Sequence, residues 1–300
     1  MFFGQDNYDY TKLENDLSQL KRFFDIDLDT IGKSVCGRNL YAVTIGSGPK
    51  HVFYNGVHHG LEWITAPLLV RFLYDVLNYS MNHTRLVTYN VEKMLERVTL
   101  HVVPMVNPDG VDIVLHGVDR ESQDYAKLVS WNRSEDFSKR WQSNYHGVDL
   151  NHNYDAGFEL SKKAEYEYGI LGPSYTRYAG EFPESEPETK AVCDYVRKND
   201  FSLVLAYHSQ GEVIYYDYNG YVPEHGYEIG KQLSLSSGYL LDKTAGIASY
   251  GGFKDWFIQT YQRPGYTIEV GHGVNPLGIY QFEEIYQKNV ELMILAAYLC

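Results

Sequence analysis

Apolar residues along the chain follow two different periods in alternation. Short apolar runs predict strands at 40–45, 52–57, 98–106, 201–207 and 266–270. The near-continuous run at 201–207 is typical of a central strand that is buried on both faces. Between these runs, apolar residues at helical spacing predict amphipathic helices. The helices are expected at about 11–23, 62–79, 185–199, 225–236, 251–260 and 279–299.

Three short segments predict how these elements begin or connect. Thr11 and Glu14 form a capping-box pattern, which predicts the start of the first helix. The segment Gly46-Ser47-Gly48-Pro49 predicts a hairpin-type turn between the first two strands. Asn107-Pro108-Asp109-Gly110 has proline and glycine where a type I turn prefers them, so we expect a turn that shapes a cleft.

Strands and helices alternate over the whole chain, so one α/β domain spanning residues 1–300 is the simplest interpretation. Residues 107–184 differ, because they are rich in Asn, Asp, Gly, Ser and Tyr and show little periodicity. A long irregular segment in a compact domain is usually functional. We therefore expect functional residues in this segment.

Composition limits the kinds of partner. The 300 residues carry 26 basic and 39 acidic side chains, a formal net charge of −13. This charge disfavours nucleic acid or an anionic membrane as the main partner, because phosphates would be repelled. The most apolar stretches, such as 64–77, are too short or too polar to span a bilayer. The 28 tyrosines offer hydroxyl groups to polar ligands such as peptides or sugars.

Cysteine usage and the N-terminal sequence bear on the compartment. Cys36, Cys193 and Cys300 are far apart, which does not suit a disulfide framework. Residues 1–20 lack a basic start followed by an apolar run, so we see no signal peptide. We expect a cytoplasmic protein, and the alternative is the cell wall or the extracellular space if a segment has been lost. No feature indicates an oligomeric state.

A candidate metal site follows from residues at predicted strand ends. His59 and Glu62 come shortly after the strand at 52–57, and His208 directly follows the strand at 201–207. Open α/β sheets place their ligands at the carboxyl ends of strands. Two histidines and one glutamate are a peptidase-type zinc set that leaves one position open. The alternatives are a chance His-x-x-Glu spacing and an ordinary core histidine at 208.

Two further carboxylates suit such a site. Glu269 lies in the apolar strand at 266–270, where a carboxylate is costly unless it is paired or functional. Beside a zinc site it could take a proton from water and pass it to a leaving amine. An ordinary buried ion pair is the alternative. Asp149 is a candidate to accept the second N–H of a zinc-bound histidine.

Several motifs, taken in order, resemble the zinc carboxypeptidase family of the pancreatic type. The resemblance is strongest to its bacterial branch, the γ-D-glutamyl–diaminopimelate endopeptidases of peptidoglycan, and it covers nearly the whole chain. The motifs are Ile31-Gly32-Lys33-Ser34 with Gly37-Arg38, His59-Gly60-Leu61-Glu62-Trp63-Ile64-Thr65, Val106-Asn107-Pro108-Asp109-Gly110, the segment 147–154, Tyr207-His208-Ser209-Gln210-Gly211-Glu212, Gly251-Gly252 with Asp255-Trp256, and Thr267-Ile268-Glu269-Val270-Gly271.

The resemblance implies both a fold and a mechanism. The implied fold is a three-layer α/β/α domain around a mixed sheet of about eight strands. One Zn²⁺ would be held by His59, Glu62 and His208, with Glu269 as general base and acid and Asp149 as the partner of His59. Such an ion polarises the scissile carbonyl and lowers the pKa of water. The implied partner is a peptide or muropeptide substrate.

The chain departs from the family's pattern in residues that bind substrate. Asn151-His152 stands where the pattern reads Asn-Arg, and histidine cannot reproduce the arginine fork that clamps a terminal carboxylate. Trp141-Gln142 stands where the pattern reads Trp-Arg or Trp-Lys. That cation would stabilise the oxyanion, whereas Gln142 can donate a hydrogen bond but supplies no charge.

Other residues are candidates for these missing roles. Arg140 or Arg133 could supply the oxyanion cation instead. Ile247 aligns with a cleft tyrosine of the digestive members, and Tyr250, three residues later, could reach the cleft in its place. Lys254 aligns with the floor of the specificity pocket, where a cation suits an acidic group on the residue after the cut. A solvated helix face is the alternative for Lys254.

The departures indicate the kind of substrate. Loss of the carboxylate clamp points away from strict C-terminal exopeptidase action, and the distal carboxylate of meso-diaminopimelate suits Lys254. The sequence therefore predicts hydrolysis of the γ-D-glutamyl–meso-diaminopimelate bond in peptidoglycan stem peptides. The alternatives are a zinc carboxypeptidase that prefers acidic side chains, a zinc amidohydrolase of N-acyl amino acids, and a wall-binding module without catalysis.

Overall fold

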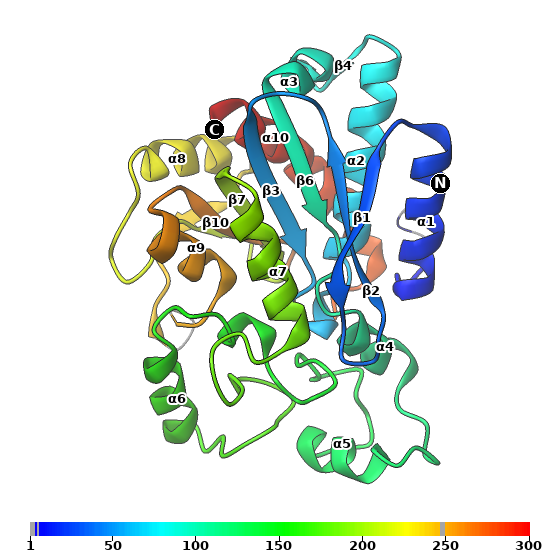
Figure 1. The fold of residues 1–300 in the computed structure, drawn as a ribbon, viewed down its shortest axis with the longest axis vertical. Helices are drawn as coiled ribbons and strands as arrows, with labels where there is room; N and C mark the ends of the chain where they lie inside the picture. The colour runs from blue at the N-terminus through cyan, green and yellow to red at the C-terminus, as the bar shows by residue number, and fades with distance from the viewer. Residues whose placement is uncertain (1–3, 5, 247–249) are drawn as a thin grey trace.

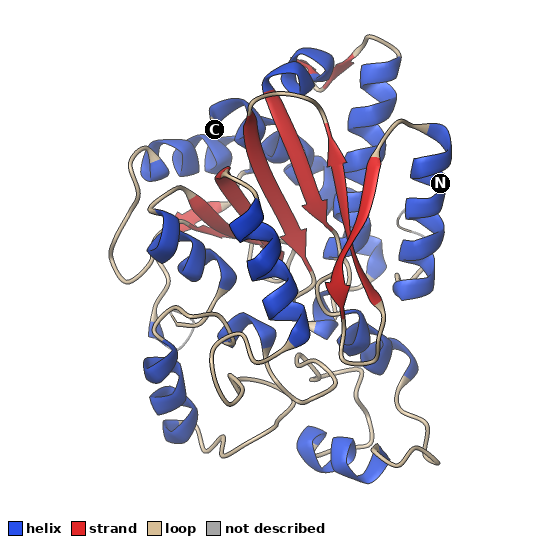
Figure 2. Ribbon diagram, in the orientation of Figure 1, coloured by secondary structure: helices blue, strands red, loops and turns tan. Residues whose placement is uncertain are grey.

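An eight-stranded mixed sheet forms the centre of the protein (Figure 1, Figure 2). The computed structural model describes residues 4, 6–246 and 250–300. The strand order is β1-β2-β6-β3-β7-β10-β8-β9. The strands are β1 (Asp27–Lys33), β2 (Asn39–Ile45), β3 (Lys50–Gly56), β6 (Val98–Val103), β7 (Phe201–His208), β8 (Val213–Tyr215), β9 (Leu240–Asp242) and β10 (Gly265–Glu269), and a separate small sheet pairs β4 (Arg85–Leu86) with β5 (Tyr89–Asn90).

Helices cover both faces of the sheet, which confirms the expected three-layer α/β/α fold. One apolar cluster takes residues from α1 (Tyr10–Phe23), α2 (Thr65–Met81), α8 (Gly226–Ser237) and α10 (Phe282–Leu299). The second cluster takes residues from α7 (Pro187–Lys198) and α9 (Phe253–Tyr261). In β3, Val52 and Tyr54 belong to the first cluster and Phe53 to the second, because successive side chains of a strand point to opposite faces.

The remaining helices are short. They are α3 (Val91–Arg97), α4 (Pro108–His116), α5 (Tyr125–Asn132), α6 (Phe158–Glu167), η1 (Gly60–Glu62), η2 (Leu150–His152) and η4 (Ile279–Gln281). Over the described ranges, no helix is both long enough and apolar enough to cross a bilayer.

Three parallel strands position the candidate site. The register places Gly56 of β3 beside Tyr207 of β7, and His208 of β7 beside Glu269 of β10. The carboxyl ends of β3, β7 and β10 therefore meet at one end of the sheet. The segment 107–184, which contains α4, α5, α6 and η2, lies beyond that end (Figure 1).

The predicted hairpin between the first two strands is wrong. β6 lies between β2 and β3, and pairs antiparallel with β2 and parallel with β3. The turn at 46–49 instead packs on the chain that enters β6, where the carbonyl oxygen of Gly48 accepts from Thr99 Oγ1 (2.8 Å). A Cβ on Gly48 would lie 1.9 Å from the carbonyl carbon of Arg97, so this close approach requires glycine.

Three helix starts also differ from prediction. Asp9, not Thr11, is the N-cap of α1, because its Oδ1 accepts from the backbone N of Lys12 (2.9 Å). The expected turn at 107–110 is the start of α4, where Asn107 Oδ1 accepts from Gly110 N (2.9 Å). The helix predicted at 62–79 divides into η1 and α2, which leaves the ligand-bearing residues in a tight loop.

Candidate active site

The loop between β3 and α2 carries two of the predicted metal ligands. His59 precedes η1 and Glu62 ends it. Asn107 holds this loop in place, since its Nδ2 donates to the carbonyl oxygen of His58 (3.0 Å). A Cβ on Gly60 would lie 2.4 Å from a backbone carbonyl oxygen in the first turn of α4. The loop and α4 can therefore approach this closely only with glycine at position 60.

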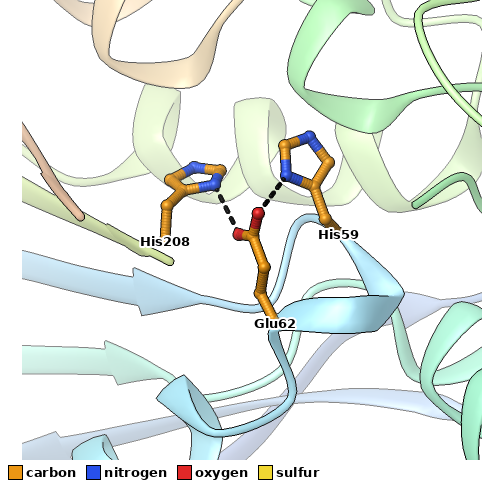
Figure 3. A group of neighbouring side chains, drawn as sticks. All are labelled: His59, Glu62 and His208. Atoms are coloured by element: carbon orange, nitrogen blue, oxygen red, sulfur yellow. Dashed lines mark hydrogen bonds and ion pairs between the residues drawn. The ribbon is translucent and has the colours of Figure 1, made fainter. Parts of the chain in front are cut away.

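His59, Glu62 and His208 point toward one another (Figure 3). One ligand atom from each lies within 4.8 Å of the other two. The Glu62 carboxylate lies between the imidazoles, with Oε1 2.8 Å from His59 Nδ1 and Oε2 2.8 Å from His208 Nδ1. His208 is the last residue of β7, so the sheet fixes one ligand while the loop supplies the other two.

The electrostatics of this group suit a divalent cation. Burial opposes ionisation of Glu62, but the nearby histidines outweigh it and lower the pKa of the carboxyl to about 2. His59 Nε2 lies 3.0 Å from Asp149 Oδ1, and a proton on Nε2 leaves the Nδ1 lone pair facing Glu62. Two Nδ1 atoms and a carboxylate at these distances need a positive charge among them, which protons on the imidazoles or a metal cation can supply. The donor set therefore fits zinc.

The sheet register places Glu269 beside this group, as its partner on β7 is His208. Burial raises the pKa of the Glu269 carboxyl well above its usual value, and the charge of Glu62 raises it further, with His59 acting in the opposite direction. None of the described residues forms an ion pair with Glu269, so the alternative of an ordinary buried ion pair does not apply. A half-buried carboxyl in this position can hold and release a proton.

Asp149 connects the ligand loop to the segment 175–178. Its Oδ1 faces His59 Nε2, and its Oδ2 accepts from the backbone N of Arg177 (2.8 Å). The backbone N of Asp149 donates to the carbonyl oxygen of Tyr178 (2.7 Å). Burial opposes ionisation of Asp149, but His59, His152 and the hydrogen bond from Arg177 N keep the pKa of the carboxyl below its usual range. The carboxylate is therefore placed to fix the tautomer of His59.

Known proteins share both the sequence pattern and the fold. The profile of the zinc carboxypeptidase family (peptidase M14) matches residues 16–291. The chain belongs to this family. It is 37% identical over 297 residues to gamma-D-glutamyl-L-diamino acid endopeptidase 1 of Lysinibacillus sphaericus, covering 99% of this chain and 74% of that protein.

Two further comparisons extend the likeness. The chain is 33% identical over 282 residues to the uncharacterized protein YqgT of Bacillus subtilis (strain 168), covering 93% of this chain and 74% of that protein. The structure of bovine thrombin-activatable fibrinolysis inhibitor in complex with tick carboxypeptidase inhibitor has the same fold, with a TM-score of 0.71 at 16% identity, covering 99% of this chain and 98% of that one. The predicted zinc metallopeptidase is confirmed, with His59, Glu62 and His208 as the zinc-ligand triad.

In this member of the family, Gln142 lies against the ligand loop. Its backbone carbonyl oxygen accepts from Gly60 N (3.0 Å) and from Asn107 Nδ2 (3.2 Å). Its side-chain Oε1 accepts from Thr176 Oγ1. Because the amide oxygen is engaged, Nε2 is left as the donor. This orientation suits the predicted oxyanion role of Gln142, which stays a prediction.

The two alternative cations lie further out. Arg140 is exposed, and its guanidinium lies over the ring of Tyr175, 5.5 Å from the ring centre. Arg133 is exposed at the C-cap of α5. Neither arginine contacts the triad through a hydrogen bond or ion pair within the described part of the chain.

Asn151 and His152 are bonded to the chain around the double glycine. Asn151 Oδ1 accepts from the backbone N of Phe253 (3.1 Å), and His152 Nδ1 donates to the carbonyl oxygen of Tyr250 (2.9 Å). A Cβ on Gly251 would lie 2.4 Å from the carbonyl oxygen of His152. The substrate roles of Asn151, His152 and Tyr250 stay predictions. Ile247 lies outside the described residues.

Lys254 lies in the protein interior. It is 2% exposed, so the alternative of a solvated helix face is wrong. Its Nζ lies 2.5 Å from Asp255 Oδ1 and donates to the carbonyl oxygen of Asp217. The cation is therefore already paired, and a carboxylate ligand would have to share it with Asp255.

Sequence reasoning missed Thr176 and Arg177. Both are bonded to residues of the site, Thr176 to Gln142 and Arg177 to Asp149. They belong to no motif that the sequence displays. The signal that the sequence offers for them is their place in the irregular segment 107–184, which is predicted to be functional.

Proposed function

We propose that this zinc metallopeptidase hydrolyses the γ-D-glutamyl–meso-diaminopimelate bond of peptidoglycan stem peptides. The observation that carries the proposal is the 37% identity, over 99% of the chain, to a protein named gamma-D-glutamyl-L-diamino acid endopeptidase 1. The residues Asn151-His152 support it, because an enzyme that cuts before an amide-linked residue needs no arginine clamp for a terminal carboxylate.

The residues around the triad account for the proposed hydrolysis. Zinc bound by the triad supplies a Lewis acid that polarises the scissile carbonyl and lowers the pKa of water. Glu269 takes a proton from the attacking water on its carboxylate and gives it to the leaving amine. Gln142 Nε2 donates a hydrogen bond to the developing oxyanion. Asp149 holds the proton of His59 on Nε2, so that Nδ1 faces the centre of the triad.

The Lys254–Asp255 pair suits the distal end of diaminopimelate. That end carries both an ammonium group and a carboxylate, whereas lysine has the ammonium group alone. Lys254 takes the carboxylate and Asp255 takes the ammonium group, so both buried charges stay compensated. Lys254→Ala is expected to reduce kcat/KM more for diaminopimelate stem peptides than for lysine-containing ones. Equal losses on both peptides would rule out this role.

Mass spectrometry of products from defined stem peptides tests the function. The zinc-loaded protein is expected to cut L-Ala-γ-D-Glu-meso-diaminopimelate between the second and third residues. Removal of zinc with a chelator should abolish the cut, and an amidated C-terminus should not. Release of the C-terminal residue alone, blocked by amidation, would favour the carboxypeptidase alternative.

A further inference from the structure

Arg177 is anchored beside the zinc-ligand triad. Its backbone N donates to Asp149 Oδ2 (2.8 Å), and the other oxygen of Asp149 faces His59 Nε2 (3.0 Å). Arg177 also has a φ of 63°, in the left-handed region that non-glycine residues rarely adopt. Such a backbone persists only where its surroundings fix it, and it is found preferentially at functional sites.

The guanidinium of Arg177 is held in place without an anion. It lies over the ring of Tyr168, 4.5 Å from the ring centre. Nowhere in the described ranges does a carboxylate form an ion pair with it, whereas the partly buried Arg38 and Arg71 pair with Asp109 and Glu283 respectively. A guanidinium stacked on a ring keeps its in-plane N–H donors free for a bidentate carboxylate.

The position of the Arg177 backbone relates it to one side of the site. Thr176, the preceding residue, donates to Gln142 Oε1, and Gln142 is the predicted oxyanion donor. The oxyanion develops on the carbonyl of the acyl group, and Arg177 directly follows Thr176, so the backbone of Arg177 lies on the side of the triad where Gln142 is found. Lys254, the predicted contact for the residue after the cut, lies in α9 instead. The first residue of α9 is bonded to the site through Phe253 N, which donates to Asn151 Oδ1.

We propose that Arg177 binds the free α-carboxylate of the γ-D-glutamyl residue, on the acyl side of the bond that is cut. The inference rests on the proposed function. A γ-linkage uses the side-chain carboxyl of glutamate, which leaves the α-carboxylate as an anion close to the scissile carbonyl. Arg177 thus determines specificity for an acidic residue before the cut, in a chain that lacks the family's usual arginine at position 152.

Two peptides that differ only in this group test the inference. One is L-Ala-γ-D-Glu-meso-diaminopimelate, and the other carries a neutral α-carboxamide on the glutamyl residue. The proteins are the wild type, Arg177→Gln, Arg177→Lys and the control Arg120→Gln, which removes an exposed arginine paired with exposed Glu135. The measurements are kcat/KM for both peptides and their affinity for zinc-loaded Glu269→Gln with and without Arg177→Gln.

Arg177→Gln is expected to lower kcat/KM about 10- to 100-fold for the acidic peptide, as expected for a charge-assisted hydrogen bond. The loss for the carboxamide peptide should be no more than about threefold, and affinity should follow the same pattern. Arg177→Lys should recover part of the loss, because it restores the charge but not the fork. Arg120→Gln should match the wild type on both peptides.

Equal losses on both peptides would overturn the inference, because Arg177 would then only support the fold around Asp149. The inference would also be overturned if the wild type had the same kcat/KM for the acidic peptide and for the peptide with the α-carboxamide. If the wild type cuts neither peptide at the γ-bond, the proposed function fails and the inference fails with it. If the wild type cuts both and Arg177→Gln does not distinguish them, only the inference fails.

Discussion

Replacing Asp149 with asparagine tests whether this buried carboxylate sets the zinc affinity. Its Oδ1 faces His59 Nε2 and its Oδ2 accepts from Arg177 N. Asparagine offers one oxygen and one NH₂ group, so in either orientation a donor faces a donor. If the NH₂ group faces His59, the imidazole shifts to the tautomer with its proton on Nδ1, which blocks the metal-binding atom. If it faces Arg177, a buried N–H loses its acceptor, and His59 keeps only a neutral amide oxygen in place of the carboxylate, which is a weaker acceptor.

These two outcomes have different magnitudes and different readouts. Loss of the carboxylate that orients a metal-bound histidine weakens zinc binding by about 10- to 100-fold, or about 1.4–2.7 kcal/mol. A buried N–H without an acceptor costs about 1–3 kcal/mol of unfolding free energy. We therefore expect Asp149→Asn to bind zinc at least about 10-fold more weakly, and its zinc-free form to be no more stable than the wild type.

The assay is a competition titration of zinc between the zinc-free protein and a chromophoric chelator, combined with denaturant unfolding. Asp109→Asn is the matched control, because Asp109 is also buried and also accepts several hydrogen bonds, but from Ser34, Cys36 and Arg38. The control should lose stability and keep its zinc affinity. Wild-type zinc affinity in Asp149→Asn would refute the reasoning.

Three further predictions follow from the site and its support. Glu269→Gln should lower kcat by about 10²- to 10⁴-fold while zinc affinity in the same titration stays within a few-fold, and a parallel loss of zinc would contradict its role as base. Gly60→Ala should weaken zinc binding and stability, because its Cβ would lie 2.4 Å from Gly110 O, whereas Gly172→Ala meets nothing within 4 Å and should be neutral in both measurements. Burial raises the pKa of Glu188 to about 7, so the folded state binds more protons than the unfolded state between about pH 4.5 and 7. The free energy of unfolding should fall by roughly 3 kcal/mol as pH rises through that range. Glu188→Gln should reduce this dependence on pH. Denaturant titrations at several pH values measure it, and the same pH dependence in both proteins would contradict the prediction.

The zinc ligands could be predicted from the sequence because they follow strands that are visible as apolar runs. The predicted strands at 201–207 and 266–270 agree with β7 and β10 within one residue at each end, which places His208 and Glu269 at adjacent strand ends. The two ligands from the loop lie next to β3 in the sequence. Local pattern was therefore sufficient for the metal centre.

Other features depend on contacts between distant segments. The insertion of β6 between β2 and β3 is decided by pairing across the sheet, which no local pattern displays. β1 is mostly exposed, and it forms a strand because it pairs with β2. The burial of Lys254 depends on Asp217, 37 residues away, whose carbonyl oxygen accepts from its Nζ. Such positions cannot be read from periodicity.

The zinc ligands are attached to a sheet whose two apolar cores need no ion to hold them together. In small zinc domains, by contrast, folding and metal binding are one event. Here the stripped protein should keep its scaffold and accept another divalent ion. Reconstitution with cobalt(II) would then give the colourless site a visible absorption band, and its shift on adding a stem peptide would report ligand entry before any bond is cut.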